Sequence, residues 1–239
     1  MKPQGTLYIV ATPIGNLEDM TFRAVRVLQD VSLILCENKR NSISLFKHFA
    51  IETPSQTLYG DRSGENHLDW VVEKLRSGDN IAYVSDAGTP GISDPGSRLV
   101  RLVRDAKIAV VPIPGASALT SILSISGSQT SPTTFLGFLP EKKGKRRREL
   151  QAYENWQGCL VLYESMHRVK ITLAMLKEVF PLAEILVGRE ITKKYEEYLQ
   201  IANDEEANLP KIKGEFTILV NNHTKKITKD RNTNTDIQS

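Results

Sequence analysis

The chain has 239 residues, of which 40% are hydrophobic and 25% charged, and its formal net charge is +3. This composition is typical of a soluble globular protein with one large or two modest domains, which we expect in the cytoplasm. No apolar run approaches the roughly 20 residues of a membrane helix. Two cysteines far apart in the sequence and four histidines without ligand spacing support neither a disulfide framework nor a metal site.

Strand-like apolar runs alternate with helical patterns through the first half of the chain. The expected strands cover residues 6–12, 31–36, 81–84 and 108–111. The expected helices begin at Thr21 and near Ser42, and the others cover residues 65–76, 94–105 and 117–125. Thr21 is a good N-cap residue, and Gly78 is placed as a C′ glycine. This alternation predicts an N-terminal α/β domain, residues 1–128, with a mostly parallel sheet and helices on both faces.

The second half opens on a turn-rich stretch at residues 130–134, which we interpret as a linker. The elements expected after it are strands at 159–163, 184–188, 197–201 and 215–220 and a helix at 169–180. The short connections predict that the last two strands are antiparallel. We therefore expect a smaller mixed α/β domain over residues 129–222 and a disordered basic and polar tail over 223–239.

Three of the expected strands end in loops rich in Gly, Pro, Ser and Thr. These loops are Ala11–Leu17, Ser85–Gly96 and Pro112–Ala118. Open α/β sheets bind ligands beyond their strand ends, and glycine lets a ligand approach the bare backbone. We expect the loops to converge on one crevice, with a ligand bound between the two domains. Neither a Gly-x-Gly-x-x-Gly fingerprint nor a phosphate loop is present.

A basic cluster lies between the two predicted halves. Six cations fall within the seven residues from Lys142 to Arg148. Such a cluster can neutralise the phosphates of a nucleic acid that lies across the domain junction. A helix start whose charges are simply solvated is the alternative interpretation.

Six motifs occur in order at matching strand ends: Gly5–Leu17, Val84–Pro90, Ile92–Gly96, Pro112–Leu119, Gly137–Pro140 and Arg189–Lys193. Together they resemble the ribosomal RNA small subunit methyltransferase I family, which belongs to the tetrapyrrole methylase fold group. The resemblance covers about Gly5 to Val220 and implies a two-domain tetrapyrrole methylase-like fold. It also implies 2′-O-methylation of a cytidine in the decoding region of 16S ribosomal RNA, with S-adenosylmethionine as methyl donor and no metal. The implied partners are the 30S subunit and a second copy of the chain.

The resemblance also implies roles for individual residues. The positions that match donor-binding residues are Pro13, Ser85, Asp86, Ala87, Gly88, Thr89, Ser117, Ala118 and, in the second domain, Glu164. A base within hydrogen-bond reach would help to remove the proton of a ribose hydroxyl. The candidates are Glu37, Glu190 and Lys193, since each follows a strand end in a matched motif, and water is the alternative proton acceptor. A structural ion pair is the alternative role for Glu37 and Glu190. The expected RNA contacts are Arg40, Lys142, Lys143, Lys145, Arg146, Arg147, Arg148 and Arg168.

Three segments depart from the family pattern. Residues 37–40 read Glu-Asn-Lys-Arg where the family usually has Glu-Asp-Thr-Arg, residues 59–66 lack a His-Glu-His-Asn-Glu-like segment, and Met166 replaces a proline. The donor motifs are intact, whereas parts of the substrate-side pattern differ. Two alternatives therefore stay open: a small-molecule methylase of the same fold that acts on a tetrapyrrole, and a non-catalytic ribosome-binding relative.

Overall fold

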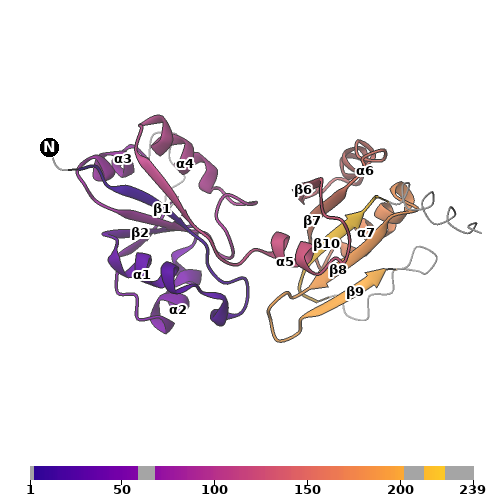
Figure 1. Ribbon diagram of the computed structural model, residues 1–239, viewed down its shortest axis with the longest axis horizontal. Coiled ribbons are helices and arrows are strands. Elements are labelled where there is room, and N and C mark those ends of the chain that lie inside the picture. The colour runs from indigo at the N-terminus through magenta and orange to yellow at the C-terminus, as the bar shows by residue number, and fades with distance from the viewer. Residues whose placement is uncertain (1–2, 59–67, 202–212, 224–239) are drawn as a thin grey trace, which may run out of the picture. The chain divides into compact units, whose positions relative to one another are not determined.

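The computed structural model describes residues 3–58, 68–201 and 213–223. The chain divides into two compact units, Met1–Ala118 and Leu119–Ser239, which we call the N-terminal and C-terminal units (Figure 1). This boundary falls earlier than the expected one after residue 128, because α5 (Ala118–Ser124) buries Ile122 against Cys159 and Val161 of the C-terminal unit. The departing segment at 59–66 and all but the first residue of the predicted tail lie outside the described residues.

The sheet of the N-terminal unit is parallel, as predicted, with strand order β3-β2-β4-β1-β5. Its strands are β1 (Thr6–Val10), β2 (Leu33–Cys36), β3 (Ser55–Thr57), β4 (Ile81–Val84) and β5 (Ala109–Ile113). All four residues of β4 are buried, because Ala82 and Val84 pack into the core on one face while Ile81 and Tyr83 pack into the core on the other. The sequence analysis missed β3, a short Ser-Gln-Thr strand without an apolar run.

Helices cover both faces of this sheet, as predicted (Figure 1). They are α1 (Phe22–Asp30), α2 (Lys39–His48), α3 (Asp69–Arg76) and α4 (Gly96–Asp105), and the short 3₁₀ helix η1 (Leu17–Asp19) before α1 buries no residue. Thr21 caps α1 by accepting a hydrogen bond from the Ala24 N–H at 3.1 Å. Apolar side chains of α1 and α2 fill one core and those of α3 and α4 the other.

The C-terminal unit has a mixed sheet with strand order β6-β7-β10-β8-β9. Its elements are β6 (Thr133–Phe138), α6 (Lys143–Gln151), β7 (Cys159–Ser165), α7 (Val169–Val179), β8 (Glu184–Arg189), β9 (Glu197–Ile201) and β10 (Glu215–Asn221). The last two strands are antiparallel to their neighbours, as predicted. Part of the stretch interpreted as a linker is β6, which pairs parallel to β7. The turn residues before it hid the strand propensity of Thr133, Thr134 and Phe135.

Candidate functional site

The three predicted loops meet at one edge of the N-terminal unit. β1 pairs in parallel with both β4 and β5, so the carboxyl ends of the three strands lie side by side. The first two loops exchange backbone hydrogen bonds, from the Thr12 N–H to the Gly88 carbonyl at 3.0 Å and from the Gly88 N–H to the Thr12 carbonyl at 3.1 Å. The Thr89 hydroxyl donates to the Ala116 carbonyl of the third loop at 3.1 Å. The loops therefore form one connected surface.

This loop surface has two features that suit a ligand. Gly88 has φ +75°, and a Cβ there would lie 3.1 Å from the Ile14 Cγ2 atom, so a side chain is both strained and crowded. The Thr12 side chain is buried, and its hydroxyl has no hydrogen-bond partner among the described residues. Because buried hydroxyls normally have a partner, a polar ligand atom or a water molecule would satisfy Thr12.

The donor positions predicted for this unit all lie on these loops. Pro13 is in the first loop, Ser85, Asp86, Ala87, Gly88 and Thr89 are in the second, and Ser117 and Ala118 end the third. Asp86 and Ala87 are exposed, whereas Ser85 and Gly88 are buried. The loops thus offer both accessible groups and a closely packed backbone.

Asp94 shapes the second loop and was missed as a site residue. Its carboxylate accepts hydrogen bonds from the N–H groups of Gly91 at 2.6 Å, Ile92 at 3.2 Å and Gly96 at 2.8 Å. Gly96 lies against Tyr83, where a Cβ would come within 2.4 Å of the ring. An Asp two residues before a Gly is the pattern of an Asx turn, which is the sequence signal that could have identified it.

Glu37 lies beside the second loop at the end of β2. Its carboxylate accepts a hydrogen bond from the Asp86 N–H at 3.1 Å, and the Asn41 amide donates to the Asp86 carboxylate at 2.8 Å. Burial raises the pKa of Glu37; the Asp86 N–H opposes this shift, while the nearby carboxylates of Asp86 and Asp94 add to it. A carboxyl group with a raised pKa beside a ligand loop is a candidate for proton transfer.

The altered residues after Glu37 begin α2. The Asn38 side chain caps the helix by accepting a hydrogen bond from the Arg40 N–H at 3.1 Å. Asn and Asp are equally good N-caps, so the change from the family's usual Asp keeps the helix start. Lys39 and Arg40 are exposed in the first turn.

Glu190 and Lys193 belong to the C-terminal unit and are paired there. The Lys193 ammonium lies 3.1 Å from the Glu190 carboxylate and 2.8 Å from that of Glu215, and the Glu215 N–H donates to Glu190 at 3.0 Å. Burial opposes ionisation of both groups, yet these hydrogen bonds outweigh it, so the pKa of Glu190 is lowered and that of Lys193 is raised. Both side chains are therefore held in their charged forms.

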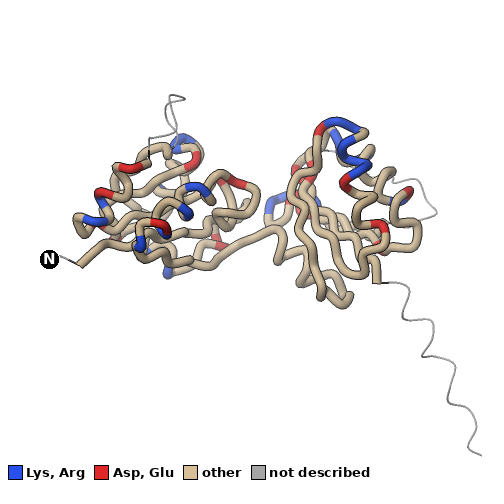
Figure 2. Tube along the Cα trace, turned by 90° about the horizontal axis from the view of Figure 1, so that it is seen from above, with Lys and Arg blue, Asp and Glu red and all other residues tan. Residues whose placement is uncertain are grey.

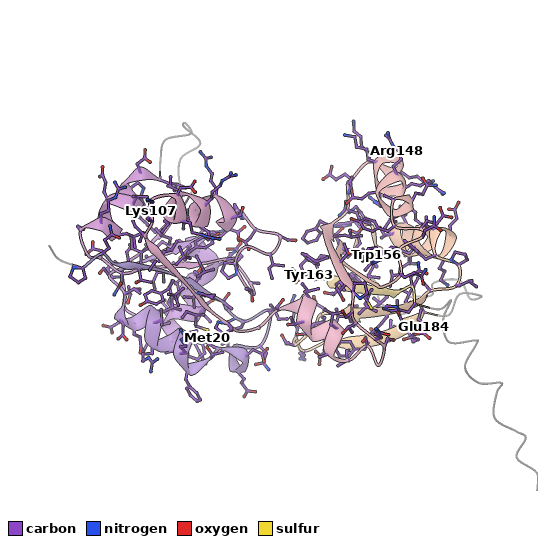
Figure 3. All side chains as sticks on the ribbon, turned by 45° about the horizontal axis from the view of Figure 1, so that its top comes forward. Met20, Lys107, Arg148, Trp156, Tyr163 and Glu184 are labelled. Atoms are coloured by element: carbon purple, nitrogen blue, oxygen red, sulfur yellow. The ribbon has the colours of Figure 1, made fainter. Side chains whose placement is uncertain are left out.

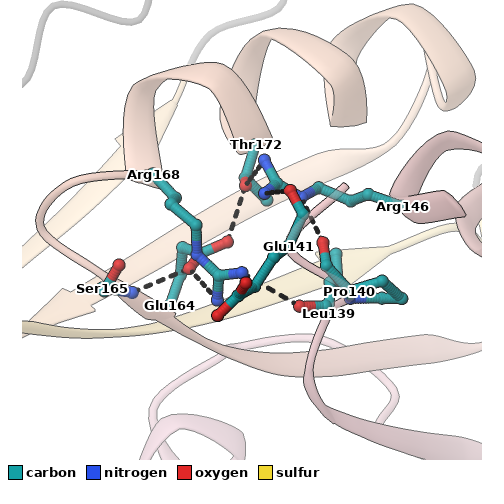
Figure 4. Close-up of polar contacts among 8 residues, drawn as sticks. All are labelled: Leu139, Pro140, Glu141, Arg146, Glu164, Ser165, Arg168 and Thr172. Atoms are coloured by element: carbon teal, nitrogen blue, oxygen red, sulfur yellow. Dashed lines mark hydrogen bonds and ion pairs between the residues drawn. The ribbon is translucent and has the colours of Figure 1, made fainter. Parts of the chain in front are cut away.

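Glu164 is the centre of a buried polar network (Figure 4). Its side chain is 0% exposed; it forms an ion pair with the Arg168 guanidinium at 2.8 Å and accepts hydrogen bonds from the Ser165 N–H and the Thr172 hydroxyl. Arg168 also donates to the Leu139 carbonyl at 3.1 Å, and its side chain is 21% exposed. The predicted donor contact at Glu164 stays a prediction, and its carboxylate already has partners within its own unit.

The basic cluster forms α6 and its start, and its members differ in their surroundings. Lys and Arg residues gather along this helix in Figure 2, and Arg148 projects from it in Figure 3. The exposed members are Lys142, Lys143, Lys145 and Arg148. Arg147 is half-buried and pairs with Glu178. Arg146 is only 3% exposed, so it is not presented on the surface with its neighbours, and the RNA contact expected of it stays a prediction.

Neither a metal centre nor a membrane helix is found in the part of the chain that the structure describes. Its residues contain no group of three or more His, Cys, Asp or Glu side chains arranged to hold a metal ion. Among them, no helix has the length and apolar character needed to cross a membrane.

Comparisons with known proteins show the family to which the chain belongs. Residues 6–205 match the family model of tetrapyrrole (corrin/porphyrin) methylases. The chain is 50% identical over 238 residues to ribosomal RNA small subunit methyltransferase I of Leptospira biflexa, covering 99% of this chain and 98% of the relative. It is 44% identical over 219 residues to the protein of the same name from Bacillus subtilis, covering 90% and 75% of the two chains.

Solved structures with low sequence identity share the fold. Uroporphyrin-III-C-methyltransferase from Thermus thermophilus matches with a TM-score of 0.59 at 17% identity, covering 92% of this chain and 96% of that one. Cobalt precorrin-4 methyltransferase, a cobalamin biosynthetic enzyme, matches with a TM-score of 0.63 at 15% identity, covering 90% and 94%. At such identities the likeness concerns the fold alone.

Proposed function

Because the chain belongs to the ribosomal RNA small subunit methyltransferase I family, within the tetrapyrrole methylases, we propose that it methylates a cytidine 2′-oxygen in the decoding region of 16S ribosomal RNA. The observation that carries this function is the 50% identity across 99% of the chain to a relative with that name. S-adenosylmethionine is the proposed methyl donor. The 30S subunit in the cytoplasm is the proposed substrate, and the proposed assembly is a homodimer.

The loop surface of the N-terminal unit is the proposed donor site. S-adenosylmethionine would supply an electrophilic methyl group on its sulfonium sulfur. The ribose 2′-oxygen would bond to this methyl carbon in line as the carbon–sulfur bond breaks, so that the demethylated thioether leaves and the hydroxyl proton passes to a base. The Thr12 hydroxyl, which has no partner in the described part of the chain, and the side-chain-free backbone at Gly88 support the proposal, because they offer a polar contact and close approach. Asp94 keeps the second loop in shape by binding its N–H groups. The main task of these residues is to align donor and acceptor.

Glu37 is the proposed base for the ribose hydroxyl. Its pKa is raised by burial, so its carboxylate accepts a proton more readily than an ordinary glutamate would. It also touches the donor loop through the Asp86 N–H. Glu190 and Lys193 are weaker candidates because of their mutual ion pair. The lowered pKa makes the Glu190 carboxylate a weaker base, and the raised pKa keeps Lys193 protonated, so that it cannot accept a proton.

The exposed cations are the proposed RNA contacts. They are Arg40 of α2 and Lys142, Lys143, Lys145 and Arg148 of α6 and its start. Arg168 is a further proposed contact through the exposed part of its guanidinium. Planar guanidinium groups pair well with phosphate oxygens, whereas base identity must be recognised by other groups. The altered Asn38 and Lys39 are the proposed cause if the target nucleotide differs from the family's cytidine.

Methylation of undermodified 30S particles tests the proposed function. The protein is incubated with labelled S-adenosylmethionine and the particles, and the label is mapped by nuclease digestion and mass spectrometry. We expect one methyl group on the ribose of a cytidine in the decoding region. Label on a base, or on a porphyrin-type compound but not on RNA, contradicts the proposal. Donor binding without any transfer identifies the non-catalytic alternative.

A further inference from the structure

Helix α6 has an unusual attachment to its unit. A surface helix normally packs through an apolar stripe, but α6 has the sequence Lys-Gly-Lys-Arg-Arg-Arg-Glu-Leu-Gln, and its buried residues are Arg146 and Leu150. Leu150 packs in the main core of the unit from the second half of the helix. In the first half, the buried side chain is an arginine. The position of that half therefore depends on what Arg146 binds.

The Arg146 guanidinium donates hydrogen bonds to two different elements. It donates to the Pro140 carbonyl at 3.1 Å and the Glu141 carbonyl at 3.0 Å, in the segment that leads into α6. It also donates to the Thr172 hydroxyl of α7 at 3.4 Å. Thr172 in turn donates to the Glu164 carboxylate at 2.7 Å (Figure 4). Arg146 thus connects the start of α6 to the buried carboxylate.

The exposed cations follow a different side of the helix. Lys142, Lys145 and Arg148 recur every three residues, so they lie next to one another along α6 and its N-cap. None of the three has an ion pair with the described residues. We call these three residues the basic ridge. Two of them, Lys142 at the N-cap and Lys145 in the first turn, precede Arg146 at the end of the helix that it anchors.

We propose that Arg146 is a positioning residue that orients the basic ridge toward RNA through its bonds to Thr172 and the Pro140–Glu141 segment. This inference rests on the proposed function, because it names which cations of the cluster contact the substrate and which one holds them in place. Without Arg146 the first half of α6 loses its buried attachment, and the ridge no longer presents its cations together.

Salt titration of 30S binding tests the inference, because the slope of log affinity against log salt counts phosphate contacts. Loss of one direct contact lowers the slope by about 0.9 for duplex or about 0.7 for single-stranded RNA. Arg148→Met should lower it by about one such contact. Arg146→Met should lower the slope by more than one phosphate contact, although it removes only one charge, as Arg148→Met does. Lys170→Met, which removes an exposed charge from α7 outside the basic ridge, is the control and should leave the slope unchanged.

Two further variants separate positioning from direct contact. Thr172→Val removes the hydroxyl that connects Arg146 to Glu164 and removes no charge, yet it should flatten the slope. Arg146→Lys keeps the charge but loses the planar set of donors, so it should behave like Arg146→Met. Each variant should show a thermal unfolding transition and should bind the donor, which confirms that it is folded. If the Arg146 variants do not fold, Thr172→Val alone tests the inference.

The inference is overturned if Thr172→Val and Arg146→Lys both keep the wild-type slope. The inference is also overturned if Arg146→Met lowers the slope by only one contact while Arg146→Lys keeps the wild-type slope. In that case Arg146 would contact a phosphate directly. Failure of the wild-type protein to bind or methylate 30S particles contradicts the proposed function instead. The two failures are therefore distinguishable.

Discussion

The candidate residues of the two units use different chemistry. In the N-terminal unit most of them are small residues and backbone groups on adjoining loops, held by hydrogen bonds such as those between Thr12 and Gly88, and the charged exceptions include Glu37 and Arg40. In the C-terminal unit they are charged side chains held by ion pairs, such as Glu164 with Arg168 and Glu190 with Lys193. Backbone groups suit a small ligand that must be aligned closely, whereas cations suit a polyanion. The difference suggests that donor and RNA are recognised by separate sets of residues.

The largest expected effect concerns the two glutamates. Glu37→Gln should lower kcat about 10²- to 10⁴-fold, since that is the usual contribution of a general base, and it should leave the donor Kd unchanged. Glu190→Gln is the matched control in the C-terminal unit and should change kcat only a few-fold, as expected for a structural ion pair. Single-turnover methylation of 30S particles measures both. Equal losses of kcat in the two variants would contradict the assignment of Glu37 as the base and of Glu190 as a structural ion-pair residue.

Gly88→Val should abolish measurable donor binding, because a side chain at φ +75° is strained and would meet Ile14. Gly127→Val is its control, since Gly127 also has a positive φ of +64° but a Cβ there would meet no atom within 4 Å among the described residues. Both variants should lose about 1–3 kcal/mol of stability from backbone strain. Calorimetry with S-adenosylmethionine should show a loss of measurable binding in the Gly88 variant alone, and an equal loss in both variants would count against a donor site at Gly88.

Asp94 offers a graded test of the same loop. Asp94→Ala removes the acceptor of three backbone N–H groups. Gly91 is exposed and its N–H can bind water, so the cost of about 1–3 kcal/mol for an unpaired buried group applies chiefly to the N–H of buried Gly96. Donor affinity should fall about tenfold or more, with a smaller loss for Asp94→Asn, which keeps one acceptor oxygen. Asp105→Ala, an exposed position at the end of α4, is the control. An unchanged donor Kd in Asp94→Ala would show that loop shape does not matter for binding.

The smallest expected effect is a difference in pH dependence. The pKa of Glu190 is lowered from 4.5, so its stabilising contribution is present above that pH and is lost as the pH falls through the lowered value. The pKa of Glu37 is raised from 4.5, so its contribution is full below that pH and is lost as the pH rises through the raised value. At pH 7, Glu190→Gln should therefore destabilise the protein and Glu37→Gln should stabilise it. Urea unfolding at pH 7 measures both, and shifts of the same sign would contradict the assigned pKa directions.

The convergence of the three loops could be predicted from sequence because their signals are local. Gly88 and its neighbours form a turn-rich run directly after an apolar strand, and the parallel sheet brings such strand ends together. The strand β6 and the assignment of Ile122 to the second core could not be predicted in this way, since both depend on packing against β7. Local propensity carries no information on such partners.

The different surroundings of Arg146, Arg147 and Arg148 were equally hidden. Three consecutive arginines have the same composition and charge, yet one is buried, one is paired with Glu178 and one is exposed. The spacing of Arg146 and Leu150, four residues apart, was the one signal for a shared buried face. Recognising it required the knowledge that Thr172 lies opposite, which comes only from the tertiary fold.

Donor calorimetry on two variants side by side tests the separation of donor and RNA recognition most directly. Wild-type protein should bind S-adenosylmethionine and its demethylated product, Gly88→Val should bind neither, and Arg148→Met should bind both as tightly as wild type. The absence of heat for wild-type protein with either compound at millimolar concentrations would contradict the account, and so would a loss of donor affinity in Arg148→Met.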